Sequence, residues 1–409
     1  MRRANIVSAA LLLVAGGGSA FAQGLTPQQE LGKSIFFDQN LSINDNQSCA
    51  ACHGPGAGWT GPDAAINAGG AVYEGSIAGR FGDRKPPSSA YATPSPVLHF
   101  VMQNKEALFI GGNFWDGRAT GQTLGSPAAE QAQGPFLNPL EQALPDAAAV
   151  VSRICASAYS GLFTQVCGAD ACDVANVSAA YACVGYSVAA YEGSPEVNQF
   201  TSKYDAFLAG RVDLTKEEKQ GLNLFKGKGK CANCHILDPG PKGEPPLFTD
   251  FTFDNLGVPR NPDNPFYNEP AFNPLGLAWI DLGLGGFLQS RVDYQAYAPA
   301  NLGKMKVPTL RNVDKWDPML GPKVKAYSHN GYFKSLWQIV HFYNTRDAKP
   351  PCVNAFTRID DALAQGCWPV PEVPVNVNTK ELGDLHLTTA QEKAIVAFMR
   401  TLSDGYTPP

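Results

Sequence analysis

Two short stretches decide how this chain can fold, Cys49-Ala50-Ala51-Cys52-His53 and Cys231-Ala232-Asn233-Cys234-His235. Each is a C-x-x-C-H motif, which is typical of covalent attachment of a c-type haem. The two thiols can add to the two vinyl groups of one haem, and the histidine that follows can bind the iron from one side. A thioredoxin-like redox pair or half of a zinc site does not explain a histidine after each pair. The sequence therefore predicts two covalently bound haems c, held by the four motif cysteines and ligated by His53 and His235.

A similar helix start precedes each motif. Thr26 begins a capping box in the first half of the chain, and Thr215 begins another in the second half. Apolar residues at helical spacing then lead towards each cysteine pair. This repetition predicts a mainly α fold with little strand, made of two tandem cytochrome c-like domains at residues 23–205 and 206–409.

A closing helix is expected in each domain. The stretch 178–191 has this role in the first domain, and Thr389 with Glu392 opens the corresponding helix of the second. Between them, the stretch 236–301 is rich in proline, glycine and asparagine. Such a composition indicates long loops, here with a short hairpin.

The composition fits an exported globular protein. The 409 residues are 44% apolar and 17% charged, and the net charge of −5 argues against nucleic-acid binding through phosphate contacts. Residues 1–22 contain a basic start, an apolar run and the sequence Ala20-Phe21-Ala22, so we expect a secretory signal that is cleaved after Ala22. No later apolar stretch is long enough to span a membrane. The mature protein is therefore expected in the periplasm, where disulfides persist.

The six cysteines outside the motifs are even in number, which predicts three disulfides in an oxidising compartment. Cys352 and Cys367 are the expected local pair. The other four allow three pairings, among which the sequence does not choose: Cys155, Cys167, Cys172 and Cys183.

Five further segments carry a family resemblance. The segments are Asn113-Phe114-Trp115-Asp116-Gly117-Arg118-Ala119, Glu130-Gln131-Ala132-Gln133-Gly134-Pro135, Asn138-Pro139-Leu140-Glu141, Lys306-Val307-Pro308-Thr309-Leu310-Arg311-Asn312 and His329-Asn330-Gly331. On these segments the chain resembles the bacterial di-haem cytochrome c peroxidase and MauG family. The resemblance covers nearly all of the mature chain and is interrupted by apparent insertions around residues 92–112, 120–128, 236–300 and 345–380. It implies unequal haems, of which the N-terminal one is the peroxide site and the C-terminal one handles electrons.

The resemblance also implies roles for single residues. Gln131 and Glu141 would line the peroxide side of the first haem, with Pro135 in the same pocket, and Trp115 would lie between the haems. A glutamate with a raised pKa can accept and return the proton that must move before the O–O bond breaks, and an amide such as Gln131 can orient bound peroxide. The indole of Trp115 is oxidisable, so it can relay charge between haems that do not touch.

The far-side ligand of the second haem distinguishes subtypes within the family. In the ordinary peroxidases it is a methionine fourteen residues beyond the position of His329, and here that position is Tyr343, as in MauG. Methionine ligation raises a haem potential, whereas an anionic phenolate should lower it. Tyr343 therefore suits a state in which both irons share two oxidising equivalents. The alternatives are that His341 is the ligand or that there is none.

An absent histidine is the second departure from the ordinary peroxidases. Those enzymes carry a histidine that blocks the peroxide site until the second haem is reduced, and residues 54–83 contain none. His99 is the only histidine between His53 and Trp115. We interpret His99 as a loop or core residue, with iron ligation as the alternative. The first haem is therefore expected to be open in the oxidised protein.

The resemblance finally implies contacts around the haems. The family binds Ca²⁺ between them through an asparagine side chain and two carbonyls, which correspond here to Lys85 and to the carbonyls of Val324 and Ala326. A lysine cannot ligate Ca²⁺, so calcium is either absent or held by Asp83 or waters. Two arginines are expected to pair with haem propionates, with plain surface salt bridges as the alternative: Arg118 and Arg311.

Together these features predict a periplasmic MauG-like enzyme. It would use H₂O₂ to reach a high-valent di-haem state and then oxidise a tryptophan or tyrosine of a partner protein by long-range electron transfer. One alternative is a peroxidase that reduces H₂O₂ with electrons from a small cytochrome c or a cupredoxin. Another is a non-catalytic di-haem electron carrier, which would not react with peroxide.

Overall fold

The fold is mainly helical with little strand, as the sequence predicts. A computed structural model describes residues 24–104, 106–240 and 243–408, so the predicted signal at residues 1–22 lies outside the described residues. The helices are α1 (Pro27–Phe37), α2 (Cys49–Cys52), α3 (Ala64–Ala68), α4 (Pro127–Leu137), α5 (Ala147–Cys155), α6 (Ser160–Cys167), α7 (Val177–Glu192), α8 (Lys203–Leu208), α9 (Lys216–Lys226), α10 (Gly283–Gln289), α11 (Leu336–Thr345), α12 (Ile359–Gln365) and α13 (Thr389–Arg400). The strands are β1 (His99–Gln103), β2 (Glu106–Ile110), β3 (Phe253–Asp254) and β4 (Met305–Lys306).

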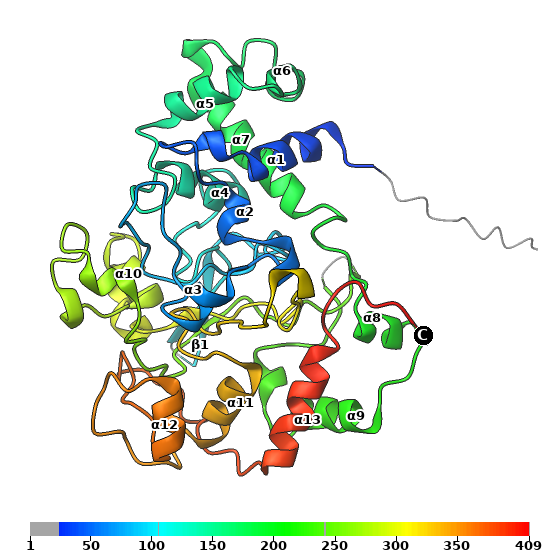
Figure 1. Cartoon of the computed structure of the whole chain (residues 1–409), viewed down its shortest axis with the longest axis vertical. Coiled ribbons are helices and arrows are strands. Elements are labelled where there is room, and N and C mark those ends of the chain that lie inside the picture. Colours follow the sequence, from blue (N-terminus) through cyan, green and yellow to red (C-terminus); the bar gives the residue numbers. More distant parts are fainter. Residues whose placement is uncertain (1–23, 105, 241–242, 409) are drawn as a thin grey trace, which may run out of the picture.

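Each half of the chain has a pair of crossing helices, α1 with α7 and α9 with α13 (Figure 1). A glycine permits each crossing. A Cβ on Gly32 would lie 1.8 Å from the carbonyl oxygen of Ser187, and a Cβ on Gly221 would lie 1.9 Å from that of Ala394. Since no side chain fits such a gap, the two glycines let the helix backbones touch. The same device in both halves agrees with the predicted repetition.

The predicted helix starts are confirmed in two cases and displaced in one. Thr26 forms a capping box with Gln29, and Thr215 forms one with Glu218. The third box uses Thr388 and Gln391, one residue before the predicted pair. Glu392 is unavailable for capping because its buried carboxylate accepts hydrogen bonds from Trp337, His341 and Asn344.

The predicted hairpin lies elsewhere. Among the described residues of the stretch 236–301, β3 pairs with β4, which follows that stretch, and α10 is a helix the sequence did not indicate. The antiparallel hairpin of the fold is β1–β2, at residues 99–110. It packs with α10 in a small apolar cluster that includes Phe109, Phe253 and Leu288. Two of the apparent insertions thus meet in space, which their distance in the sequence concealed.

Two larger cores lie in the two halves. One consists of residues between Leu31 and Val197 together with Leu247, and the other of residues between Tyr204 and Leu402. The chain passes from the first core to the second between residues 197 and 204. We therefore propose a domain boundary near residue 205.

All three predicted disulfides form, and the structure resolves their pairing. Cys352 pairs with Cys367, as expected. Cys155 pairs with Cys172, and Cys167 pairs with Cys183. The Cys155–Cys172 bond joins the end of α5 to the turn after α6, and the Cys167–Cys183 bond joins the end of α6 to α7.

In the described part of the chain, no single helix has the length and apolar character needed to cross a membrane. Helices α5 and α6 meet these criteria only as a pair, and that pair is bent by 118°.

Candidate functional site

The two C-x-x-C-H motifs have the same local geometry. The first cysteine pair begins and ends the short helix α2, and in the second pair Cys231 begins the 3₁₀ turn Cys231–Asn233 while Cys234 caps it. The backbone N–H of each motif histidine donates to the carbonyl oxygen four residues earlier, at 2.9 Å in both cases. The four motif cysteines remain free thiols while the other six are in disulfides. This donor set fits two covalently attached haems.

The surroundings of His53 and His235 suit iron ligation. Nδ1 of His53 lies 3.3 Å from the carbonyl oxygen of Trp59, and Nδ1 of His235 lies 2.8 Å from that of Phe248. These contacts hold the proton on Nδ1, so Nε2 is the nitrogen that would bind a metal. Burial lowers the pKa of His53 to about 4 and also lowers the pKa of His235. Both rings are therefore neutral at pH 7, which is the ligating form.

Each motif opens onto a cavity. The N-terminal cavity contains His53, Gln131 and Glu192 in its wall, and the C-terminal cavity contains Cys231, Cys234, His235 and Tyr343. The two cavities enclose about 670 and 1690 Å³ of space not filled by atoms, their open sides included. They share a wall of seven residues, Pro87, Ser88, Trp115, Lys306, Val307, Pro308 and Thr309. Groups bound in the two cavities would therefore be neighbours.

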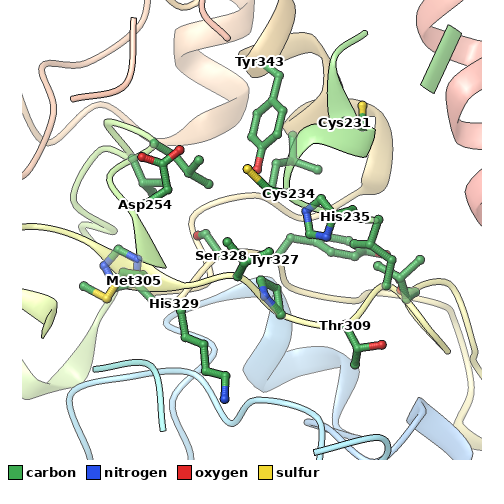
Figure 2. Close-up of a pocket in the computed structure, with 18 of the residues that line it drawn as sticks. Cys231, Cys234, His235, Asp254, Met305, Thr309, Tyr327, Ser328, His329 and Tyr343 are labelled. Carbon is green, nitrogen blue, oxygen red and sulfur yellow. The ribbon is translucent and has the colours of Figure 1, made fainter. Parts of the chain in front are cut away.

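Tyr343 enters the C-terminal cavity from α11. Figure 2 shows its hydroxyl pointing into the cavity beside Cys234 and His235. Burial raises the pKa of Tyr343, and the nearby thiols and Asp254 raise it further. The phenol is thus neutral in this protein environment, and a cation bound at its oxygen would be needed to ionise it.

His341, the competing residue, is held outside the cavity. Its Nδ1 lies 2.8 Å from the carboxylate of Glu392, its Nε2 lies 2.8 Å from Nζ of Lys349, and its ring stacks on Trp337. Both nitrogens are occupied, so the geometry favours Tyr343. Met305 and Met399 also line the cavity. Met305 packs its methyl group against α10, and Met399 belongs to the C-terminal core.

The predicted acid–base residues of the first site are partly brought together. Gln131, on α4, lines the N-terminal cavity, whereas Pro135 and Glu141 lie outside its wall. Glu141 accepts a hydrogen bond from Asn138 at 2.6 Å. Burial raises its pKa, and the charge of Arg118 and the Asn138 hydrogen bond oppose that rise. Glu141 is close enough to the first motif to raise the pKa of the Cys52 thiol, after burial itself.

A carboxyl group that does line the N-terminal cavity was missed from the sequence. Glu192, the last residue of α7, is 4% exposed. Burial raises its pKa to about 8, against a hydrogen bond with Ser89. The sequence did contain a sign that this residue is unusual, because Glu192 is the only charged residue among the sixteen of α7.

Trp115 lies in the wall that the two cavities share. It is 9% exposed, and its indole Nε1–H donates to the carbonyl oxygen of Lys85 at 2.8 Å. Its own carbonyl accepts from the N–H of Lys306 at 2.8 Å. These two bonds fix the ring between the two motifs.

The two arginines expected at propionates each have a carboxylate partner within the protein. Arg311 is buried and donates Nη1 and Nη2 to Asp205 at 3.0 and 2.9 Å and Nε to the carbonyl of Pro246. Arg118 is partly exposed, bonds Asp116 at 2.9 Å and lies over the Phe114 ring. The sequence could not reveal the pairing of Arg311 with Asp205, because the two residues are 106 positions apart, whereas Asp116 stands only two positions before Arg118.

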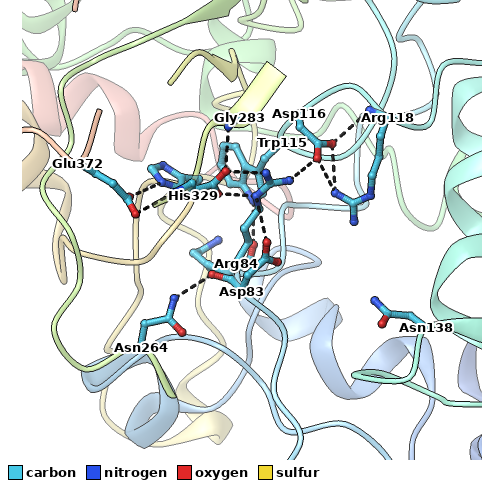
Figure 3. A network of polar contacts seen from close by, with 12 residues as sticks. Asp83, Arg84, Trp115, Asp116, Arg118, Asn138, Asn264, Gly283, His329 and Glu372 are labelled. Atoms are coloured by element: carbon cyan, nitrogen blue, oxygen red, sulfur yellow. Dashed lines mark hydrogen bonds and ion pairs between the residues drawn. The ribbon is translucent and has the colours of Figure 1, made fainter. Parts of the chain in front are cut away.

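A charged network next to Trp115 was also not foreseen (Figure 3). Arg84 forms ion pairs with Asp116 at 2.7 Å and with Asp281 at 2.6 Å. Burial alone would raise the pKa of Asp281, but the charge of Arg84 outweighs it and lowers that pKa. On the other side of the network, Nε2 of His329 lies 3.5 Å from the carboxylate of Glu372.

The position expected to ligate calcium holds a buried lysine. Nζ of Lys85 donates to Oγ1 of Thr60 at 2.9 Å and to the carbonyl of Pro86 at 2.8 Å. The Val324 carbonyl accepts from Asn67 at 3.0 Å. Since an ammonium repels a cation, these residues do not fit Ca²⁺ at position 85.

His99 is neither a loop nor a core residue. It begins strand β1, is exposed, and lies outside the walls of both cavities. Its Nδ1 contacts the carbonyl of Val97 at 2.8 Å. Among the described residues, His53 is the one histidine in the wall of the N-terminal cavity.

Comparison with known proteins agrees with this geometry. Residues 26–213 match the family described as "Di-haem cytochrome c peroxidase". The chain is 33% identical to the methylamine utilization protein MauG of Paracoccus denitrificans, over 99% of this chain and 96% of that protein. It is 26% identical to the cytochrome-c peroxidase IdrP2 of a Pseudomonas species, over 91% and 80% of the two chains. Among solved structures, the diheme peroxidase BthA of Burkholderia thailandensis superposes with a TM-score of 0.75 at 30% identity, over 94% of this chain and 88% of that one.

Proposed function

The chain belongs to the di-haem cytochrome c peroxidase family, and from this premise we propose that it is a MauG-like, H₂O₂-dependent oxidoreductase that oxidises an aromatic residue of a partner protein. Two haems c, attached at the two motifs and ligated by His53 and His235, would supply the redox chemistry, which is the reduction of H₂O₂ and the storage of two oxidising equivalents. The protein would act in the periplasm after loss of residues 1–22.

The placement of Tyr343 is the observation that carries this proposal. Its hydroxyl points into the C-terminal cavity, while His341 is bonded at both nitrogens outside it. An oxygen ligand favours the oxidised forms of iron more than a thioether does. A protein that must hold oxidising equivalents until a partner arrives benefits from that preference, whereas an enzyme that only takes electrons from a donor does not need it.

Access to the N-terminal cavity supports the same reading. Of the histidines described, none besides His53 lines this cavity, so no imidazole stands ready to occupy the opposite side. Peroxide would then enter the oxidised protein without prior reduction. Gln131 would hydrogen-bond the peroxide, and Pro135 would shape the helix α4 that carries Gln131.

Glu141 is the proposed proton carrier. Burial raises its pKa, which favours the protonated carboxyl group, and in that form the group would exchange a proton with peroxide. Since Glu141 lies outside the cavity wall, the transfer would pass through a water molecule. Arg118 and Asn138 limit the rise in pKa, which keeps the group able to accept as well as donate.

Trp115 is the proposed connection between the two sites. Hydrogen bonds to the backbone of Lys85 and Lys306 hold it in the wall that the two cavities share. Its oxidisable indole would carry charge from the N-terminal site to the C-terminal one.

Reduction of H₂O₂ by electrons from a small cytochrome c or a cupredoxin is the second candidate function. The similarity to a protein named cytochrome-c peroxidase favours it. A purified enzyme that turns over rapidly with such a donor and leaves every partner protein unmodified would support this function instead.

The decisive experiment is an optical and EPR spectrum of the fully oxidised holoprotein before and after one equivalent of H₂O₂. We expect a five-coordinate high-spin haem beside a low-spin His/Tyr haem, and an immediate reaction that yields a long-lived product. Two low-spin haems that react only after half-reduction would indicate an ordinary peroxidase. No reaction even after half-reduction would indicate a non-catalytic electron carrier.

Tyr343→Phe serves as the matched variant. It keeps the ring on α11 and removes only the ligand oxygen. We expect it to abolish the low-spin His/Tyr signal and to leave the high-spin haem unchanged. An unaltered low-spin signal would show that another group ligates the second haem.

A further inference from the structure

Two buried lysines in the wall of the C-terminal cavity have no use in the function proposed above. Lys85 is 7% exposed and Lys325 is 5% exposed. Nζ of Lys85 donates to Thr60 and to the Pro86 carbonyl, and Nζ of Lys325 donates to the carbonyls of Asn312 at 2.7 Å and Lys315 at 3.2 Å. All four acceptors are uncharged oxygens.

The absence of a carboxylate distinguishes these lysines from the buried arginines. Arg84 and Arg311 are paired with aspartates at 2.6 to 3.0 Å. Neither Lys85 nor Lys325 has a carboxylate oxygen within 4.0 Å in the described ranges 24–104, 106–240 and 243–408. Burying an unpaired ammonium costs several kcal/mol. An anion that binds in the cavity from outside the sequence would let both groups stay charged.

The two ammonium groups are also close enough to oppose each other. After burial, the charge of Lys85 is the next contribution that lowers the pKa of Lys325, and the same charge lowers the pKa of His53. Lys85 therefore lies between the first motif and the C-terminal cavity. Burial lowers its own pKa to about 7, which an adjacent anion would reverse.

The count of donors shows where an anion would bind. An ammonium has three N–H donors, and Lys85 and Lys325 each use two of them. One donor on each remains for a ligand in the cavity. A third lysine of the wall, Lys306, has all three engaged by Ser95, Asn113 and the Gly112 carbonyl, so it contributes charge but no free donor.

We propose that Lys85 and Lys325 bind propionate carboxylates of the haems, in the place that the sequence assigns to Arg118 and Arg311. The anion is of the right kind, because each haem brings two carboxylates into a cavity that the motif cysteines already define. The pairing would balance the charge of both ammonium groups, and it would hold one propionate near Trp115, whose indole bonds the Lys85 carbonyl. This inference rests on haem attachment and not on the reaction with peroxide.

The test compares Lys85→Met and Lys325→Met with Lys219→Met in the full-length, haem-loaded protein. Lys219 is an exposed lysine of α9, so its variant makes the same change in charge away from the cavity. Spectroelectrochemical titration at several pH values gives the midpoint potential of each haem. Removing a positive charge near a haem disfavours its reduction, and removing the partner of a propionate lets that carboxyl group take up a proton at higher pH.

We expect both cavity variants to lower the midpoint potential of at least one haem. We also expect them to shift the pH dependence of that potential to higher pH, while Lys219→Met matches the wild type. Potentials and pH profiles in both cavity variants that match the wild type would overturn the inference. Lys85→Arg should restore the wild-type potential, since it returns charge and donors.

If the variants fail to take up haem, the wild-type holoprotein provides the test. In its crystal structure, a propionate oxygen about 2.7–3.2 Å from Nζ of Lys85 or Lys325 supports the inference, and propionates directed at other groups refute it. The readout is independent of peroxide chemistry. Shifted potentials in a protein inert to H₂O₂ would uphold the lysine pairing and reject the proposed function.

Discussion

Replacing Glu192 with glutamine should stabilise the protein in a manner that depends on pH. Glu192 is 4% exposed at the end of α7, and burial raises its pKa from the ordinary 4.5 to about 8. Between these values the carboxyl group is ionised in the unfolded chain and protonated in the folded one. The unfolded chain therefore binds fewer protons in this window, and stability falls as the pH rises.

The size of the effect follows from the width of that window. Each pH unit inside it costs about 1.36 kcal/mol of unfolding free energy. From about pH 5 to about pH 7 the wild type should therefore lose about 3 kcal/mol relative to E192Q. Above the folded pKa of about 8 the difference should become constant.

Urea denaturation of the holoprotein, followed by far-UV circular dichroism at several pH values, measures this difference. E217Q is the control, because Glu217 is exposed on α9 and should follow the wild type at every pH. A gap between E192Q and the wild type that stays constant from pH 5 to pH 7 would refute the reasoning. It would mean that Glu192 is ionised in the folded protein.

Three further predictions concern the buried ion pair, the shared wall and a disulfide. Arg311→Met leaves the buried carboxylate of Asp205 without its partner and should lower the free energy of unfolding by about 3–5 kcal/mol in urea denaturation. A loss below about 1 kcal/mol would contradict the pairing, and adding Asp205→Asn should recover part of the lost stability. Trp115→Phe should leave haem content unchanged and slow the exchange of oxidising equivalents in stopped-flow spectra after one equivalent of H₂O₂; an unchanged rate would exclude Trp115 as the relay. Replacing Cys352 and Cys367 by serine opens a loop with a separation of 15 residues, which should cost about 3 kcal/mol and lower the Tm; an unchanged Tm would show that this bond adds no stability.

Local signals made much of this protein predictable. The two C-x-x-C-H motifs, the first two capping boxes and the local Cys352–Cys367 pair depend on residues close together in the sequence, and the structure agrees with each. The third capping box was displaced by one residue, because burial of Glu392 is a property of the packed helices. The hairpin at residues 99–110 was missed, since its support comes from α10, far along the chain.

The site shows the same division. The sequence by itself predicted the four cysteines and two histidines of the C-x-x-C-H motifs, because that pattern is local, and the family resemblance pointed to Tyr343. Only the tertiary structure decided which charges meet. It paired Arg311 with Asp205 and placed Glu192 in the wall of the N-terminal cavity. Within the described residues, it left Lys85 and Lys325 bonded to uncharged oxygens. Electrostatic partners depend on distances between segments that fold together, and no spacing along the chain contains them.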